Sequence, residues 1–513
     1  MSSQTLEFGS SNPQGAAPQA VFASTGIAAR PLDLATQSPG LATQYSAVRR
    51  FTHRLCEPLA TEDYVIQSMP DVSPTKWHIA HTSWFFETFI LGETVPGYRP
   101  FHPRFNYLFN SYYNTIGERH PRPIRGLLSR PTVEEVFRYR AYVDEHMAGF
   151  LDRLDADLAA NGPDAALACW APLVAIGLHH EQQHQELLVT DIKNVFAINP
   201  LRPAYRPQAQ AQSHLQAPAL RGEGLPALDW RPFEGGVYEI GLDPAGGAQS
   251  ALIAERGRTA ELGRTAFDTF AFDNESPRHH VYLEPFALGS RLVTNGEYLA
   301  FMGEDGYRRP EFWLSDGWYA VQANGWAAPM YWEREGAGHD GWQAMTLAGM
   351  RAVDEDEPVC HVSLYEADAY ARWAGARLAT EAEWEVAAQS VPVKGNFVDD
   401  FHFHPVPSGK PTGPGMPTGH GRNGARPQAA TVVLHQMFGD VWEWTASSYS
   451  PYPGYRPAAG ALGEYNGKFM CNQLVLRGGS CATSANHIRA TYRNFFPADA
   501  RWQFSGIRLA RNV

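Results

Sequence analysis

The sequence predicts an α+β protein of more than one domain, in which a helical N-terminal half precedes a mixed C-terminal half. Apolar residues recur every three to four positions in the first half, as they do on the buried face of a helix. The second half combines abundant Gly, Pro and Trp with short alternating segments. A chain of 513 residues, 44% of them hydrophobic, is long enough to form two or three domains with buried cores.

The helical half is expected over residues 44–198. Periodic apolar segments lie within it at 45–60, 74–92, 132–159 and 164–197. Four such segments predict a four-helix bundle, because each can bury its apolar stripe against the others. Ser73 followed by Pro74 is typical of a helix start, so the second helix is expected to begin just before Trp77.

The mixed half is expected over residues 229–513. It contains short alternating segments such as HHVYLEPFAL and one clear helix, LYEADAYARWAG, at 364–375. Residues 1–43 are rich in Ser, Gln, Ala, Pro and Gly without a helical or strand period, which predicts a disordered leader. Residues 199–228 are rich in Pro, Gln and Ala and are expected to be a linker.

Charge and apolar runs restrict the class of partner. The net charge is -12 and no long Lys/Arg run occurs, which argues against binding to nucleic acid or to an anionic membrane. The N-terminus lacks the order of a signal peptide, and no apolar run approaches the roughly 18 residues of a membrane span. We therefore expect a soluble protein with small-molecule partners.

The cysteines predict neither a disulfide framework nor a cysteine zinc site. They are five in number, scattered, and without CxxC spacing: Cys56, Cys169, Cys360, Cys471 and Cys481. A reducing, cytoplasmic location fits this usage.

Histidines on two helical segments form the main candidate site. His180 and His184 lie four residues apart, about 40° around a helix, and share a stripe with apolar residues. His81 shares a stripe with aromatic residues on the second helix, so all three are expected to face inward. His179 lies off the stripe and is expected at the surface, whereas His78 lies to one side and is expected at the surface or behind the ligands.

Three inward imidazoles could hold one metal ion and leave positions open for other ligands. Neutral imidazoles suit iron, zinc and copper, so the residues do not choose among these metals. The alternative is that the histidines are ordinary residues of a polar helix face, although burying an unpartnered imidazole would be costly.

Longer motifs identify a resemblance. SPTKWHIAHTSWFFE, LFNSYYNTIGERHPRPIRG and HEQQHQELLVTDIK resemble the DinB-like helical domain of the sulfoxide synthases of ergothioneine biosynthesis, also called hercynine oxygenases. PVCHVSLYEADAYARWAGARLATEAEWEVAA, FGDVWEWT and LRGGSCATSANHIRATYRNFFPADARWQFSGIRLA resemble the C-type-lectin-like domain of formylglycine-generating enzymes. The resemblance extends over about residues 45–513. It implies a DinB-like four-helix bundle followed by a mixed α/β domain of the formylglycine-generating-enzyme type.

The resemblance also implies a reaction and its cofactor. Such enzymes hold a non-haem iron(II) on three histidines, which correspond here to His81, His180 and His184. They use O2 to join imidazole C2 of hercynine to the sulfur of a thiol donor and to form a sulfoxide. Gln183 corresponds to a glutamine that helps to hold the histidine-derived substrate.

Further residues acquire roles through the same resemblance. Tyr112 and Tyr113 correspond to a tyrosine pair proposed to supply a proton, and a phenol of pKa about 10 is protonated at neutral pH. Asn494, Phe495 and Phe496 correspond to a substrate wall, where aromatic faces could hold a trimethylammonium group. Packing in a loop or in the core is the alternative for these side chains.

The thiol donor is left open between several compounds. Arg119, Arg122 and Arg125 offer forked donors for substrate carboxylates, although at least one could be a surface residue. Another branch of the family has Trp-Asp in place of Phe495-Phe496 and uses that Asp to bind γ-glutamylcysteine, so cysteine is favoured here. Selenoneine synthases share this architecture and join hercynine to a selenosugar, which is the alternative function.

Two other classes of function are less favoured. A formylglycine-generating activity would require a cysteine pair, and only Cys481 lies near the RGGS motif. A non-enzymatic binding module can have a fold of this kind, but it would not explain three inward histidines.

Overall fold

A computed structural model describes residues 40–207, 225–243, 270–334, 341–409, 433–458 and 460–513. Nearly all of the predicted leader at 1–43 and the middle of the predicted linker at 199–228 lie outside the described residues. None of the described helices combines the length and apolar character required to cross a membrane.

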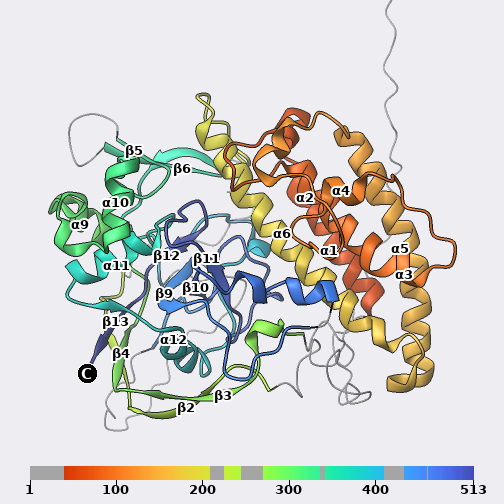
Figure 1. The fold of residues 1–513 in the computed structure, drawn as a ribbon. Helices are drawn as coiled ribbons and strands as arrows, with labels where there is room; N and C mark the ends of the chain where they lie inside the picture. Colours follow the sequence, from red (N-terminus) through yellow and green to blue (C-terminus); the bar gives the residue numbers. More distant parts are fainter. Residues whose placement is uncertain (1–39, 208–224, 244–269, 335–340, 410–432, 459) are drawn as a thin grey trace, which may run out of the picture. The chain divides into compact units, whose positions relative to one another are not determined.

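Four long helices form the N-terminal half, as the periodicity predicts. They are α1 (Leu41–Cys56), α2 (Thr75–Phe86), α5 (Val133–Asn161) and α6 (Ala171–Ile198). α2 packs against α5 and α6, and α1 packs against α6 (Figure 1). The second helix begins at Thr75, close to the predicted start, whereas the fourth begins several residues later than its apolar pattern indicated.

Short elements connect these helices. They are η1 (Thr61–Val65), the π-helical turn η2 (Glu87–Leu91), α3 (Gly92–Thr94), α4 (Phe105–Phe109), η3 (Arg122–Leu127), η4 (Gly162–Asp164) and η5 (Ala168–Trp170). α5 begins with a capping box, in which Thr132 accepts from the Glu135 backbone N–H and the Glu135 carboxylate accepts from the Thr132 N–H.

The C-terminal half contains two four-stranded sheets. The first has the order β1 (Trp230–Phe233), β4 (Phe286–Gly289), β13 (Leu509–Asn512) and β8 (Arg377–Leu378). The second has the order β11 (Asn494–Phe496), β10 (Leu474–Arg477), β9 (Trp442–Ser448) and β12 (Ser505–Gly506), with β12 parallel to β9.

Smaller antiparallel sheets and helices complete this half. The strands are β2 (Gly236–Ile240) with β3 (His279–Leu283), and β5 (Trp332–Arg334), β6 (Trp342–Thr346) and β7 (Gly349–Ala352). The helices are α9 (Asn295–Gly303), α10 (Ser315–Asn324), α11 (Leu364–Trp373) and α12 (Glu381–Ala388). Several short 3-10 turns connect them.

The prediction of one clear helix in this half was incomplete. α9 and α12 are short and have weakly separated apolar faces, so periodicity did not reveal them. Their starts carry a readable signal nevertheless, because Thr294 with Glu297 and Thr380 with Glu383 form capping boxes.

α6 is the element that joins the two halves. The Gln185 side chain donates to Val48 O of α1, at a distance of 2.9 Å, on the side of the bundle. The next residue, Glu186, accepts from Trp442 of β9 in the C-terminal half. Most of α6 is therefore buried, because the bundle covers one side and the C-terminal half covers another (Figure 1).

Candidate metal centre

His81 of α2 and His180 and His184 of α6 lie together, as their positions on the inward stripes predict. Each offers one ligand atom, and these atoms all lie within 4.8 Å of one another. The Nε2 atoms of His81 and His180 are 3.1 Å apart. His81 and His180 are buried and His184 is half-buried.

The three imidazoles are suited to bind a metal as neutral ligands. Burial lowers the pKa of His180 to about 3 and also lowers the pKa values of His81 and His184 well below the ordinary histidine value. A neutral imidazole keeps a lone pair that can bind a metal. Two ligand nitrogens at right angles around an ion, each at about 2.1 Å, would be roughly 3 Å apart. The observed separation and the donor types therefore fit a divalent metal.

Neighbouring groups orient His81. Its ring stacks between Trp77, with centroids 4.6 Å apart, and Trp84, with centroids 5.4 Å apart. Its Nδ1 lies 2.6 Å from the backbone oxygen of Phe109 in α4. Because a carbonyl can only accept, Nδ1 carries the proton and Nε2 presents its lone pair to the cluster. The Nδ1 of His180, in contrast, is buried without a hydrogen-bond partner in the described part of the chain.

The predictions for the two flanking histidines had different outcomes. His78 lies behind His184 and is buried, which agrees with its expected position behind the ligands. The surface position predicted for His179 was wrong, since its residue is only 1% exposed. Its ring stacks on Phe270 at 4.3 Å, and its Nδ1 lies 2.9 Å from Nδ1 of His487. The C-terminal half covers this side of α6, which the periodicity of a single helix could not reveal.

Gln183 contacts two tyrosines that sequence reasoning missed. Its Nε2 donates to the hydroxyl of Tyr492 at 2.7 Å, and its Oε1 accepts from the hydroxyl of Tyr465. The ring centroid of Tyr465 lies 5.7 Å from that of His180. Gln183 is thus oriented beside the histidine cluster by aromatic residues of the C-terminal half. No local pattern singles out Tyr465, whereas Tyr492 stands two residues before the predicted Asn494.

Tyr112 and Tyr113 lie on the same side of the cluster as Trp84. Their rings stack with centroids 4.6 Å apart, and the Tyr113 ring is 5.7 Å from that of Trp84. The Tyr112 ring also makes an edge contact with Phe469, at 5.1 Å. Burial raises the pKa of both tyrosines above the ordinary value, so both hydroxyls keep their protons at neutral pH.

The three predicted arginines are in different environments. Arg125 is 3% exposed, its guanidinium carbon lies 3.4 Å from the Trp77 ring centroid, and it donates to Ser73 Oγ at 3.0 Å. It forms no ion pair with a carboxylate of the described residues, and burial lowers its pKa. Arg119 and Arg122 are exposed, and they donate to Asn114 Oδ1 and Asp71 O. Only Arg125 therefore reaches the surroundings of the histidines.

The predicted aromatic pair is divided between two environments. Phe495 stacks on Tyr449 at 4.1 Å and lies 5.8 Å from Phe469, whereas Phe496 contacts Trp502 at 5.9 Å. Both belong to β11, where successive side chains point to opposite faces. Phe495 is connected through Phe469 to Tyr112, but Phe496 is not part of that wall. The Asn494 side chain accepts from the Phe495 backbone N–H.

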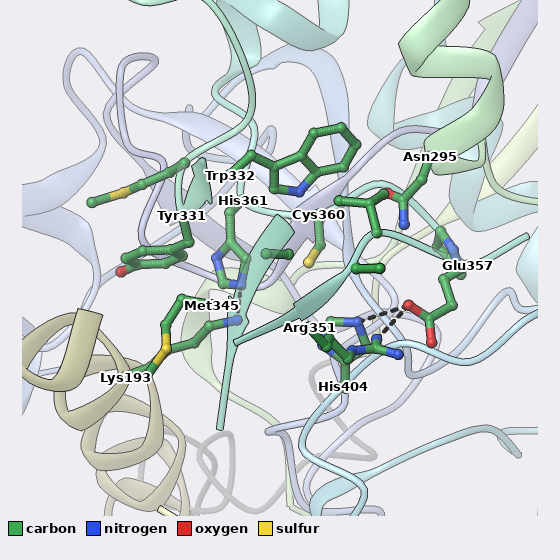
Figure 2. Close-up of a pocket in the computed structure, with 15 residues that line it drawn as sticks. Lys193, Asn295, Tyr331, Trp332, Met345, Arg351, Glu357, Cys360, His361 and His404 are labelled. Carbon is green, nitrogen blue, oxygen red and sulfur yellow. Dashed lines mark hydrogen bonds and ion pairs between the residues drawn. The ribbon is translucent and has the colours of Figure 1, made fainter. Parts of the chain in front are cut away.

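A separate small pocket lies farther along α6. Lys193 lines it, nine residues and about 14 Å of helix beyond His184. Figure 2 shows Lys193 beside His361, with 2.6 Å between Nζ and Nε2, and Glu357 paired with Arg351 and His404. The ammonium also lies over aromatic rings, including that of Phe504 at 4.6 Å. Because its charged groups have partners within the protein, we assign no ligand to it.

The amino-acid sequence matches two family descriptions. "DinB superfamily" matches residues 44–188, and "Sulfatase-modifying factor enzyme 1-like domain" matches residues 252–513, which is more than half of the chain. The first covers the bundle that supplies the three histidines. The second covers most of the half that contacts Gln183 and Glu186.

Curated relatives match this chain over more than half of their own length. The chain is 30% identical to the hercynine oxygenase of Mycolicibacterium smegmatis over 485 residues, covering 92% of this chain and 99% of that protein. It is 31% identical to that of Mycolicibacterium thermoresistibile over 472 residues, covering 86% of this chain and 88% of that protein. It is 37% identical to that of Mycobacterium tuberculosis over 251 residues, covering 47% and 56%. With its DinB-like bundle followed by a domain of the formylglycine-generating-enzyme type, the chain belongs to the hercynine oxygenase family.

Proposed function

We propose that this protein is an O2-dependent, non-haem iron(II) oxygenase that joins imidazole C2 of hercynine to the sulfur of a thiol donor and produces a sulfoxide. The observation that carries the proposal is the buried cluster of His81, His180 and His184, whose donor nitrogens lie within 4.8 Å of one another. Bound iron(II) would supply redox chemistry with O2 and Lewis acidity toward a thiolate. The comparison with hercynine oxygenases supports hercynine as the substrate and an oxygenase reaction. Among the metals that imidazole accepts, iron is the one that the resemblance of the motifs implies.

The protein residues would bind and orient hercynine beside the histidines. Gln183 lies in a fixed orientation between Tyr465 and Tyr492, so its amide can direct a polar group of the substrate. The Phe495 ring, which stacks on the buried Tyr449, would offer an aromatic face to a trimethylammonium group, which has no N–H to donate. Phe495 would then contribute to the substrate wall, while Phe496 supports the strand.

A proton would come from the tyrosine pair. Because burial raises the pKa values of Tyr112 and Tyr113, their hydroxyls are protonated at neutral pH and can act as general acids. Tyr113 is fully buried between Tyr112, Phe89 and Trp84, and Tyr112 is half-buried. The stacked rings exclude water, so the pair would donate a proton to a substrate atom bound beside them.

The donor that best fits the site carries a carboxylate. Arg125 is a buried cation without a carboxylate partner among the described residues, and a substrate carboxylate would provide one. If Arg125 binds the donor, and not the carboxylate of hercynine, cysteine is favoured over a selenosugar, whose sugar ring has no carboxylate. Cysteine is also favoured over γ-glutamylcysteine, because Phe496 stands where another branch of the family has an acid that helps to bind that donor.

Product analysis tests this proposal. Iron-loaded enzyme would be supplied with hercynine, O2 and either cysteine, γ-glutamylcysteine or a selenosugar, singly and in competition, and the products identified by mass. We expect a sulfoxide joining hercynine and cysteine as the main product. Exclusive use of the selenosugar would assign the protein to the selenoneine synthases, and product formed without hercynine would refute the assignment.

A further inference from the structure

A chain of hydrogen bonds connects His184 to a buried carboxylate on the side away from the histidine cluster. Nδ1 of His184 lies 2.8 Å from Nδ1 of His78, and Nε2 of His78 lies 3.0 Å from Oδ2 of Asp191. The same carboxylate oxygen accepts the backbone N–H of Ser73 at 2.8 Å. His78 and Asp191 are both buried, so water does not compete for these bonds.

The donors and acceptors of this chain assign its protons. The Asp191 carboxylate can only accept, so Nε2 of His78 carries a proton and donates it. A neutral His78 then has a bare Nδ1, which must accept from Nδ1–H of His184. His184 is thereby left with a bare Nε2, which is the form of imidazole that binds a metal. The opposite direction of donation would put the proton on Nε2 and prevent its use as a ligand.

Helix geometry holds these residues in place. His78 stands three residues before His81 on α2, so the helix that supplies one ligand also supplies the support of another. Asp191 stands seven residues after His184 on α6, two turns along the same face. The chain of bonds therefore connects the two ligand helices at the metal site.

The three candidate ligands consequently differ in what stands behind them. His81 donates to the neutral carbonyl of Phe109, and His180 has no partner for Nδ1 among the described residues. His184 alone is connected, through His78, to a negative charge. A carboxylate behind a ligand imidazole makes that imidazole a stronger donor and fixes its orientation.

We propose that His78 and Asp191 act as a positioning relay, which fixes the metal-binding tautomer of His184 and strengthens its bond to the metal. This inference rests on the metal site of the proposed function. It assigns no contact with substrate to either residue. Asp191 acts mainly through its negative charge. His78 acts mainly by fixing the orientation and the tautomer of the His184 ring.

Two variants separate these roles. His78→Phe removes both hydrogen bonds and keeps an aromatic ring of similar size. Asp191→Asn can keep an acceptor oxygen for His78 and Ser73 while removing the charge. His146→Phe is the control, because Nδ1 of His146 lies 2.8 Å from Tyr142 O in its own helix, α5, and its ring contacts Tyr98 and Tyr142, neither of which belongs to the histidine cluster.

The experiment measures metal affinity and metal spectra instead of turnover. Each full-length protein is titrated anaerobically with Co(II) and with Fe(II) against a competing chelator, and the visible spectrum of the Co(II) form is recorded. We expect His78→Phe to weaken affinity by about 10- to 100-fold and to change the Co(II) spectrum. Asp191→Asn should weaken affinity less than His78→Phe. It should also raise the reduction potential of the iron form, because it removes a negative charge that stabilises the ferric ion. His146→Phe should match the wild type.

The possible failures can be told apart. Wild-type affinity and an unchanged spectrum in folded His78→Phe and Asp191→Asn proteins would overturn the relay and leave the metal site standing. If His78→Phe does not fold, an unchanged affinity, spectrum and potential in Asp191→Asn overturn the relay alone. If the wild type binds neither metal, both the metal site and the relay are wrong.

Discussion

The carboxylate of Glu186 accepts a hydrogen bond of 2.6 Å from the indole Nε1 of Trp442. The same carboxylate accepts from Ser480 Oγ at 2.9 Å and from Thr483 Oγ1 at 2.8 Å. All four residues are buried. This side chain is one of several on α6 that attach the C-terminal half to the helix carrying His180 and His184, so the aromatic residues of that half and the histidines are held in one arrangement.

Replacing Glu186 should loosen that arrangement. Glu186→Ala removes the acceptor of three buried donors. One hydroxyl can then donate to the other, since Ser480 Oγ and Thr483 Oγ1 lie 3.2 Å apart, and each group left unsatisfied costs roughly 1 to 3 kcal/mol. We expect a clear fall in the temperature of the unfolding transition in calorimetry. Glu145→Ala, at an exposed position of α5, is the control and should leave the transition unchanged. Equal transitions in both variants would contradict the role assigned to Glu186.

The three clustered histidines should each be required for metal binding. His81→Ala, His180→Ala and His184→Ala should lose stoichiometric iron after anaerobic loading, as measured by elemental analysis. His179→Ala should retain the metal but unfold at a lower temperature, because it removes the buried stacking on Phe270. Full iron content in any of the first three proteins would reject the ligand set.

The metal-free protein should lose stability as the pH falls below about 6.5. Burial lowers the pKa values of nine histidines of the described residues, among them His81, His180, His184, His361 and His487. Between their folded and unfolded pKa values the unfolded chain binds more protons, so the free energy of unfolding rises with pH in this window. Their contribution is complete above about pH 6.5. A melting temperature that is unchanged or higher at pH 5.5 than at pH 7.5 would disagree with this expected pH dependence.

The tyrosine pair should affect catalysis without affecting the metal. Replacing the proposed proton donor, by Tyr112→Phe or Tyr113→Phe, should lower kcat by about 100-fold or more while iron content stays the same. Tyr142→Phe serves as the control, because this hydroxyl bonds to the Arg99 carbonyl on the exposed side of α5. Normal kcat in both tyrosine variants would exclude the pair as proton donors.

Arg125 should determine the affinity for the thiol donor. Arg125→Met keeps an unbranched side chain but removes the charge, so KM for cysteine should rise at least about 10-fold with a smaller change in kcat. Arg122→Met, at an exposed position of the same loop, should show the wild-type KM. Steady-state kinetics of both variants make the comparison, and equal KM values would refute the carboxylate contact.

Local helix geometry explains why the histidine cluster could be predicted. The spacing of His180 and His184, and the position of His81 among aromatic residues, already place all three on inward faces of α2 and α6. The bundle itself follows from the same periodicity. The short helices α9 and α12 could not be predicted from periodicity, because a helix of two turns has too few positions for a period to be recognised.

Contacts between distant segments could not be predicted. Gln183 forms hydrogen bonds with Tyr465 and Tyr492, and these contacts depend on how the C-terminal half covers α6. The misplacement of His179 has the same origin, since one side of α6 was treated as open to solvent. The resemblance to the family predicts Phe495 and Phe496 as one pair, whereas the strand that contains them turns their side chains to opposite faces.

The central claim is that one metal ion binds where His81, His180 and His184 meet. Crystals grown anaerobically with iron(II) and hercynine, with anomalous diffraction measured at the iron edge, test it most directly. We predict one strong peak within bonding distance of a ring nitrogen of all three histidines. A peak elsewhere in the molecule would contradict this claim. So would the absence of any peak in crystals grown with enough iron(II) to saturate the protein.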